Sequence, residues 1–138
     1  MQGYNCIMVY NKNEDKLLFC KRLYDPYEGM YNLVGGKIDD GETSEEAAYR
    51  ELYEETGISR HDVELSHMMD FTYYNQDCYV EVYVGTLNKE VVLKPEKHPL
   101  HWLTLDEDFF DLEKFAGEGN IGHMIEQVNI YGKGCKEE

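Results

Sequence analysis

Three glutamates stand close together in one short segment of the sequence: Glu51, Glu54 and Glu55. On an α-helix, residues three and four positions apart share a face, so these carboxylates would converge on one patch. Like charges at this spacing destabilise a bare helix, but oxygen ligands of this kind suit hard divalent cations such as Mg²⁺ or Mn²⁺. The spacing therefore indicates a metal site, although an acidic helix face can also be merely solvated.

The residues that precede the glutamates extend this pattern. Glu42 lies in the loop before them, and Arg50 is placed to orient or neutralise a neighbouring carboxylate. Gly35 and Gly36 allow a close approach of the backbone, where a free carbonyl is a further candidate ligand. Lys37 follows these glycines. A divalent cation would reconcile such a site with an anionic substrate, and the predicted reaction is attack of water on phosphorus, with a carboxylate taking the proton.

A helix over residues 44–56 is predicted to position the glutamates. Thr43 and Glu46 have the spacing of a capping box, and Gly57 is a favoured helix end. At about 100° per residue, one side of this helix is apolar. That side comprises Ala48, Tyr49, Leu52 and Tyr53.

The remaining elements follow from apolar periodicity. Strands are predicted at 4–10, 16–22, 31–34, 63–74, 78–87 and 101–103, with a turn at 75–77. A second capping box at Thr104 and Glu107 predicts a short helix over 104–112, and apolar spacing predicts a last helix over 121–131. This order is typical of an α/β (α+β) domain, a mixed α/β sandwich. The length predicts one domain, 1–138.

Composition narrows the possible partners and location. Lys plus Arg is 13 and Asp plus Glu is 28, which gives a net charge of −15, so a nucleic-acid polymer is not an expected partner. No apolar run approaches the roughly 20 residues of a membrane span, and no signal peptide precedes the first strand, so we expect a cytoplasmic protein. The scattered cysteines are interpreted as free thiols, with a disulfide as the minor alternative. They are Cys6, Cys20, Cys78 and Cys135, the last within a tail, 133–138, that we expect to be frayed.

The segment from Gly36 to Ile58 resembles the signature of the Nudix hydrolases. That signature is Gly, five residues, Glu, seven residues, then Arg-Glu-aliphatic-x-Glu-Glu-x-Gly-aliphatic, and every fixed position is met. The resemblance implies an α/β/α sandwich with a mixed central sheet and Mg²⁺-dependent hydrolysis of a nucleoside diphosphate linked to another group. It also implies metal ligation by Glu51, Glu54, Glu55 and the Gly35 carbonyl, with Glu42 as a ligand or support and Arg50 orienting Glu51.

Two residues are candidates for the general base. Glu96, six residues before Trp102, looks like the acid that the 8-oxo-dGTP-hydrolysing branch carries in a loop, as base and further metal ligand. A surface charge is the alternative interpretation of Glu96, and Glu51 is the rival base. The histidines are interpreted as structural and left out of the site: His61, His67, His98, His101 and His123.

Several residues resemble substrate contacts of the triphosphate-cleaving branch. Arg22 and Lys37 are candidates for phosphate contacts, and Asn32 for reading a base. Phe115 is a candidate for stacking on a purine, and Glu118 or Asn120 for bonding its edge. The alternatives are ordinary surface charge for Arg22 and Lys37, and a loop with a helix N-cap at Asn120.

We therefore prefer a nucleoside triphosphate such as 8-oxo-dGTP, cleaved to a nucleoside monophosphate and pyrophosphate. Dinucleoside polyphosphates, for which Tyr73 or Tyr74 would be a weak mark, and ADP-ribose or nucleotide sugars are the alternatives. A non-catalytic nucleotide sensor is a further one, which the complete glutamate set disfavours. The resemblance is compatible with a monomer or a homodimer.

Overall fold

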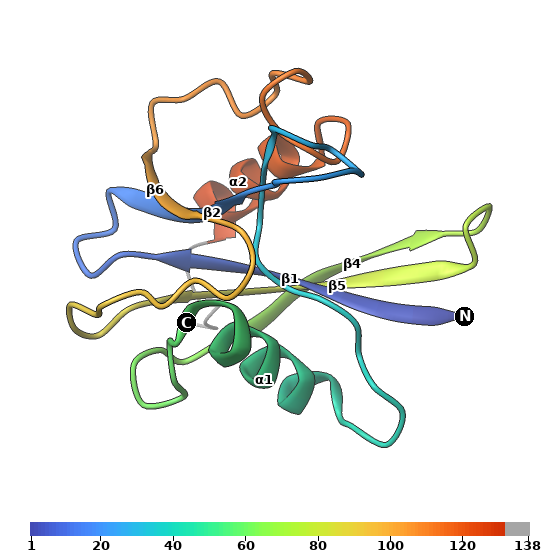
Figure 1. Cartoon of the computed structure of the whole chain (residues 1–138), viewed down its shortest axis with the longest axis horizontal. Coiled ribbons are helices and arrows are strands. Elements are labelled where there is room, and N and C mark those ends of the chain that lie inside the picture. Colours follow the sequence, from blue (N-terminus) through green and yellow to red (C-terminus); the bar gives the residue numbers. More distant parts are fainter. Residues whose placement is uncertain (132–138) are drawn as a thin grey trace.

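The computed structural model describes residues 1–131 and contains six strands and two helices over that range (Figure 1). Cys135 and the predicted frayed tail lie outside the described residues. In chain order the elements are β1 (Gln2–Tyr10), β2 (Lys16–Lys21), β3 (Tyr31–Asn32), α1 (Ser44–Thr56), β4 (Ser66–Tyr73), β5 (Cys78–Thr86), β6 (Leu100–Thr104) and α2 (Asn120–Tyr131).

The strands form one mixed sheet in the order β3-β2-β1-β5-β4, and β6 pairs with β2 off this path. Strands β1 and β5 are parallel along their whole length, from Gln2 opposite Cys78 to Tyr10 opposite Thr86. The other pairs are antiparallel. The parallel pair requires a long crossover, and the segment from 11 to 77, which includes α1, supplies it.

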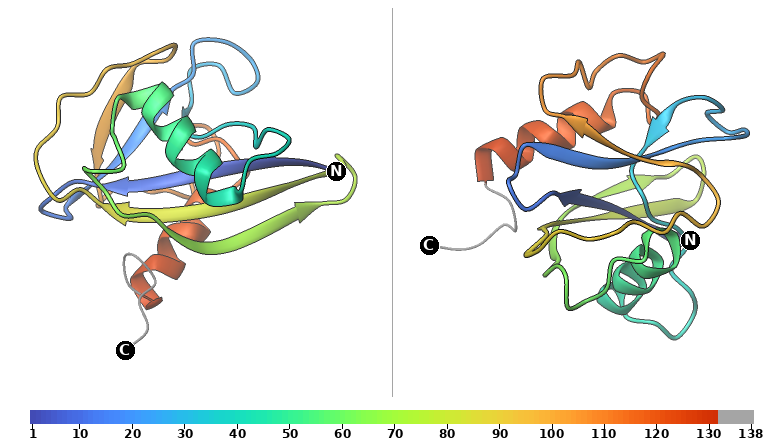
Figure 2. Two further views of the ribbon diagram at one scale, coloured as in Figure 1. Left: turned by 90° about the horizontal axis from the view of Figure 1, so that it is seen from below. Right: turned by 60° about the vertical axis from the view of Figure 1, so that its left-hand side comes forward.

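The two helices cover opposite faces of the sheet (Figure 2). Because side chains alternate along a strand, β1 contributes to both cores: Ile7 packs in the cluster with Leu52 of α1, and Met8 in the cluster with Ile125 of α2. The predicted sandwich with a mixed sheet is confirmed. Within residues 1–131, neither helix is long and apolar enough to span a bilayer.

Three details differ from the predictions. Residues 105–119 form turns and loops instead of a helix over 104–112; Thr104 ends β6, and its hydroxyl bonds the Asp106 carboxylate. The strand predicted at 31–34 is only Tyr31–Asn32, followed by an isolated bridge between Val34 and Ile7. Tyr53 is 60% exposed, because the buried side of α1 is centred on Ala48 and Leu52 and also takes in Ala47 and Thr56.

The described cysteines are free thiols, namely Cys6, Cys20 and Cys78. Burial raises the pKa of Cys20 to about 11 and that of Cys6 to about 12. Both thiols therefore stay protonated at neutral pH and are poor nucleophiles.

Candidate active site

Helix α1 is fixed at both ends, as the sequence predicts. The Thr43 hydroxyl accepts the Glu46 N–H at 3.1 Å, and the Glu46 carboxylate accepts the Thr43 N–H at 3.0 Å. At the other end, Gly57 has φ of +80° and donates its N–H to the Tyr53 carbonyl at 2.9 Å. This left-handed conformation favours glycine, so Gly57 ends the helix at a defined residue.

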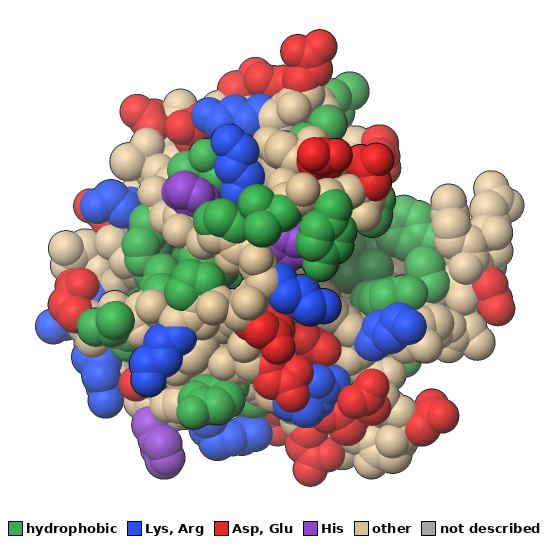
Figure 3. All heavy atoms as spheres, in the orientation of Figure 1, with side chains coloured by type: hydrophobic (Ala, Val, Ile, Leu, Met, Phe, Trp, Pro, Cys, Tyr) green, Lys and Arg blue, Asp and Glu red, His purple; other side chains and the backbone are tan. Residues whose placement is uncertain are grey.

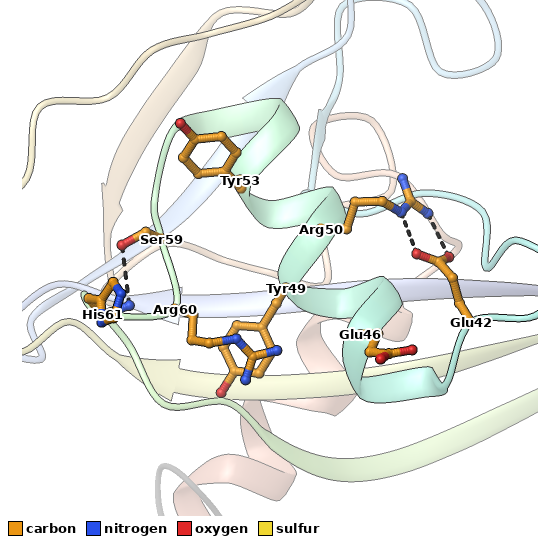
Figure 4. A pocket seen from close by; sticks show the side chains of 8 residues that line it. All are labelled: Glu42, Glu46, Tyr49, Arg50, Tyr53, Ser59, Arg60 and His61. Carbon is orange, nitrogen blue, oxygen red and sulfur yellow. Dashed lines mark hydrogen bonds and ion pairs between the residues drawn. The ribbon is translucent and has the colours of Figure 1, made fainter.

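Arg50 lies among the carboxylates of this helix and its preceding loop. Its Nε and Nη2 donate to the two oxygens of Glu42 at 2.6 and 3.0 Å (Figure 4). Its Nη1 donates to Glu51 at 3.2 Å and to Glu54 at 3.1 Å, which shows that these two carboxylates converge. Both Glu42 oxygens are bound to the guanidinium, so of its two predicted roles the geometry favours support.

The turn at Gly35 and Gly36 packs closely against the carboxylates of Glu55 and Glu51. Gly35 donates its N–H to Glu55 at 3.0 Å, and a Cβ added at Gly36 would lie 2.5 Å from the Glu51 carboxyl carbon. Asn5 holds the turn from below: its N–H donates to the Gly36 carbonyl at 2.8 Å, and its side-chain oxygen accepts the Gly36 N–H at 2.9 Å.

Only glycine fits the first position of this turn. Gly35 has φ of +144°, and a Cβ there would lie 2.1 Å from the Asn5 carbonyl oxygen. Among residues 1–131, no hydrogen-bond donor reaches the Gly35 carbonyl, so that oxygen is available to a ligand.

The carboxylates differ in their affinity for protons. Burial raises the pKa of Glu55 to about 7, and the nearby charges of Glu51 and Glu96 act in the same direction. Burial also raises the pKa of Glu51, against the opposing effect of Arg50, whereas the hydrogen bond from Arg50 lowers the pKa of Glu42. A cation bound beside Glu55 and Glu51 would relieve this repulsion.

A cleft of about 200 Å³ opens beside Glu55 and brings together residues from distant parts of the sequence. Arg22, Asn32, Gly35 and Glu55, all predicted from the sequence, line it together with Lys97. The cleft therefore has carboxylate on one side and two cationic side chains near it. Figure 3 shows acidic side chains gathered over α1 and the loop before it, with basic side chains beside them.

Glu96 reaches the same region from the loop before β6. A narrow cavity beside the cleft is lined by Glu55, Glu96, Lys97 and Leu100, and the charge of Glu96 acts on Glu55. The antiparallel pairing of β6 with β2 brings this loop to the cleft, since Cys20 lies opposite Leu100.

The structure does not bring every predicted substrate residue to the cleft. Phe115 is 2% exposed and packs on Phe19 and Phe109, with ring centroids 5.4 and 5.1 Å away. The ring therefore belongs to the core in this structure, a position that disfavours stacking on a base, and that role stays a prediction.

Three further predicted residues lie outside the set that lines the cleft. Glu118 accepts the Tyr27 hydroxyl at 2.8 Å, and Asn120, the first residue of α2, donates to the Tyr73 hydroxyl at 2.6 Å. The side chain of Lys37 is exposed, while its backbone carbonyl accepts Arg50 Nη2 at 3.0 Å. Their contacts with substrate stay predictions.

Five residues that line the cleft were not predicted as site residues, and three of them are polar or aromatic side chains of the two flanking loops: Tyr24, Lys97 and His98, with Cys20 and Leu33 as the other two. His98, interpreted from the sequence as structural, lines the cleft and accepts the Leu23 N–H at 3.0 Å on Nδ1. Burial, with the charges of Arg22 and Lys97, lowers its pKa. Their sequence positions were the available signal, because Lys97 and His98 follow Glu96 directly and Tyr24 is two residues from Arg22.

The oxygen atoms gathered at this site are of the kind that bind a hard divalent cation. Carboxylate oxygens and an available backbone carbonyl surround a turn in which any Cβ at Gly36 would displace Glu51. Among residues 1–131, no three Asp, Glu, His or Cys side chains are close enough together to hold a metal ion in their present arrangement. Arg50 accounts for this in part, because it draws Glu51 and Glu54 toward itself.

A larger hollow, of about 590 Å³, lies on the outer side of α1 (Figure 4). Its walls include Tyr49, Tyr53 and Arg60, whose guanidinium carbon lies 3.9 Å from the Tyr49 ring centroid. It shares Glu42 and Arg50 with the carboxylate cluster, but Gly35 and Glu55 are not among its lining residues. The smaller cleft is therefore the better candidate for the reacting centre.

Comparison with known proteins identifies the family of this domain. Residues 2–122 match the NUDIX domain family. The chain is 31% identical over 137 residues to the NAD-capped RNA hydrolase NudC of Haemophilus influenzae (strain PittEE), a match that covers 96% of this chain and 48% of that protein. It is 45% identical over 47 residues to the ADP-ribose pyrophosphatase of Methanocaldococcus jannaschii, covering 34% of this chain and 28% of that protein.

Among solved structures, the crystal structure of a C. elegans Ap4A hydrolase binary complex superposes with a TM-score of 0.75 at 19% identity. That match covers 95% of this chain and 97% of the other, and it shows the shared fold. The fold and the arrangement around α1 thus define a Nudix-type domain. The chain belongs to the Nudix family, and it spans about half the length of the NudC relative.

Proposed function

We propose that this domain hydrolyses a phosphoanhydride bond in a nucleoside diphosphate linked to another group, with Mg²⁺ as cofactor and Mn²⁺ as a substitute. One observation carries the proposal: Glu55 lies between the carboxylate cluster of α1 and a cleft that Arg22 and Lys97 also line. Carboxylates that hold a cation beside cationic side chains can accommodate the charge of a diphosphate.

The residues take distinct roles in this proposal. Glu51, Glu54, Glu55 and the Gly35 carbonyl would hold the ion, which supplies charge stabilisation at phosphate oxygens when bound. Arg50 orients Glu51 and Glu54, and Glu42 holds Arg50 in place. Arg22 and Lys97 would bind the phosphate groups that lie in the cleft.

Glu51 and Glu96 are the two candidates for the general base. Glu51 contacts the Gly36 turn, and Glu96 lies close enough to Glu55 to affect its pKa. Replacing each by Gln distinguishes them. Loss of the base removes the acidic limb of the pH dependence of kcat, whereas loss of a metal ligand raises the Mg²⁺ concentration needed for half-maximal rate.

For the substrate, we propose a nucleoside triphosphate such as 8-oxo-dGTP, cleaved to a nucleoside monophosphate and pyrophosphate. The two cations of the cleft and the nearby amide of Asn32 support this choice, since the amide can read the edge of a base. ADP-ribose or an NAD-like dinucleotide is the second candidate, favoured by the similarity to NudC and to the ADP-ribose pyrophosphatase.

The proposal is tested with a nucleotide panel of 8-oxo-dGTP, ADP-ribose, NAD and diadenosine tetraphosphate. We expect turnover with Mg²⁺, none with EDTA, and the fastest rate with 8-oxo-dGTP. Fastest turnover of ADP-ribose or NAD would establish the second candidate instead. No turnover of any nucleotide would refute the hydrolase and leave a nucleotide sensor.

Variants of α1 test the metal assignment. Glu54→Gln should lower kcat at least about 100-fold, because it removes a charged metal ligand while changing an exposed position. Glu45→Gln is the matched control, since Glu45 is an exposed glutamate in the first turn of the same helix. Equal rates of the two variants would contradict the assignment.

Four features stay predictions from the sequence. They are a single domain over 1–138, a cytoplasmic location, the absence of a nucleic-acid polymer as partner, and a monomeric or homodimeric state.

A further inference from the structure

One hydrogen bond joins the two loops that flank the cleft. These are the 22–30 loop, which follows β2, and the 94–99 loop, which precedes β6. Leu23 of the first donates its N–H to Nδ1 of His98 in the second, at 3.0 Å and across 75 residues of sequence. The His98 ring also contacts the Tyr24 ring, with centroids 5.0 Å apart.

This bond continues the pairing of the two strands beyond their last residues. The backbone ladder between β2 and β6 reaches Cys20 opposite Leu100, and Lys21 then donates its N–H to the Pro99 carbonyl at 2.9 Å. Leu23 follows Lys21 by two residues, and its N–H also donates to the segment before β6. Its acceptor is the side chain of His98 instead of a backbone carbonyl. The ring of His98 therefore replaces a ladder bond where the two chains begin to separate.

Each loop supplies residues to the cleft. The 22–30 loop contributes Arg22 and Tyr24, and the 94–99 loop contributes Lys97 and His98, with Glu96 in the cavity beside them. The relative position of the two loops therefore sets the distance between Arg22 and Lys97. The carboxylates of α1 do not depend on this contact, because their helix is held by its own caps.

The direction of the bond specifies which ring nitrogen is needed. A backbone N–H requires an acceptor, so Nδ1 presents its lone pair to Leu23 and the ring proton of neutral His98 resides on Nε2. The side-chain oxygen of asparagine lies at the position of Nδ1. The polar end of glutamine reaches only the position of Nε2.

We propose that His98 is a positioning residue, whose Nδ1 holds the 22–30 loop against the 94–99 loop so that Arg22 and Lys97 are placed together for the phosphate groups of the substrate. This inference rests on the proposed function for its catalytic consequence. A hydrogen bond of this kind shifts an open–closed equilibrium by about threefold to tenfold, and apparent affinity falls with the fraction of closed protein. The effect belongs to KM, since saturating substrate restores the closed arrangement of both loops, Glu96 included, and the carboxylates of α1 stay in place throughout.

The test compares three variants with wild type. His98→Gln should raise KM for the best nucleotide of the panel, by a factor that reaches at most about tenfold, and leave kcat within about twofold. His98→Asn restores the acceptor, so its KM should stay within about twofold of wild type. His123→Gln, at an exposed histidine of α2, is the control for loss of an imidazole and should change neither constant.

A second measurement needs no substrate. In ¹⁵N-labelled protein, a scalar coupling across the hydrogen bond between Leu23 N and His98 Nδ1 should be present in wild type and absent in His98→Gln. The Leu23 amide should keep a hydrogen-bonded chemical shift in His98→Asn. Melting temperatures of all variants check that the fold is retained.

These outcomes separate the two proposals. If wild type turns over no nucleotide, the proposed function fails, while the coupling and a titration with inorganic pyrophosphate still test the role of His98. The inference is overturned if the coupling is absent from wild type, if His98→Asn and His98→Gln raise KM equally, or if His98→Gln lowers kcat and leaves KM unchanged.

Discussion

Replacing Gly36 by alanine should displace the Glu51 carboxylate without unfolding the protein. The added Cβ would lie 2.5 Å from both the carboxyl carbon and one carboxyl oxygen of Glu51, against an ordinary contact of at least 3.4 Å. The carboxylate must therefore withdraw by about 0.9 Å, the difference between these two distances. Gly36 does not have a positive φ, and the group that moves is the end of a flexible side chain. We thus expect a loss of less than about 1 kcal/mol in stability.

The expected cost in activity is much larger. A displacement of about 1 Å in a positioned group can lower a rate by about 100-fold. We expect that loss in kcat/KM for Gly36→Ala, measured as pyrophosphate or nucleotide release with saturating Mg²⁺. Urea unfolding of the same samples gives the stability term, and Mn²⁺ binding followed by electron paramagnetic resonance reports the metal site directly.

A double-mutant cycle with Glu51→Asp gives the decisive control. Aspartate is shorter by one methylene, so its carboxylate already lies farther from the position of the new Cβ. If the clash is the cause, Gly36→Ala should cost less than about tenfold in the Glu51→Asp background. A loss of about 100-fold in both backgrounds, or no loss in either, would refute the reasoning.

Two further predictions concern stability. Burial raises the pKa of Glu55 from 4.5 to about 7, so the stability that this group contributes is present below pH 4.5 and is lost as the pH rises through 7. With EDTA present, Glu55→Gln should therefore be more stabilising at pH 8 than at pH 5 by about 2 to 3 kcal/mol in urea unfolding; equal effects at both values would contradict the pKa. Thr43→Ala should lower the free energy of unfolding by about 1 kcal/mol, because it removes the N-cap of α1. Glu45→Ala is the near-neutral control, and equal losses in the two variants would exclude the cap as the cause.

Helix α1 could be predicted in detail because its signals are local. Thr43, Glu46 and Gly57 act within a few residues of themselves, and the three glutamates converge through helix geometry alone. The same kind of signal failed at Thr104, where β6 pairing with β2 extends the backbone up to that residue and no buried helical stripe follows. A capping pattern without an apolar face to bury is not sufficient for a helix.

The loop residues could not be predicted because they depend on contacts between distant segments. His98 reaches the cleft only through the pairing of β2 with β6, which joins positions about 80 residues apart, as in Cys20 opposite Leu100. Phe115 shows the opposite case. Its hydrophobicity is compatible with both a core position and a stacking surface, and only the packing of Phe19 and Phe109 decides between them.

In the sequence of α1, the carboxylates are interspersed with residues buried in the core. Leu52 follows Glu51 directly, Thr56 follows Glu55 directly, and both are fully buried. Substitutions in this segment are therefore constrained twice, by chemistry and by folding. The 22–30 and 94–99 loops contribute few buried side chains, so they can diverge at little thermodynamic cost. Laboratory libraries aimed at changing the selectivity of the cleft should accordingly randomise these two loops first and leave α1 unchanged.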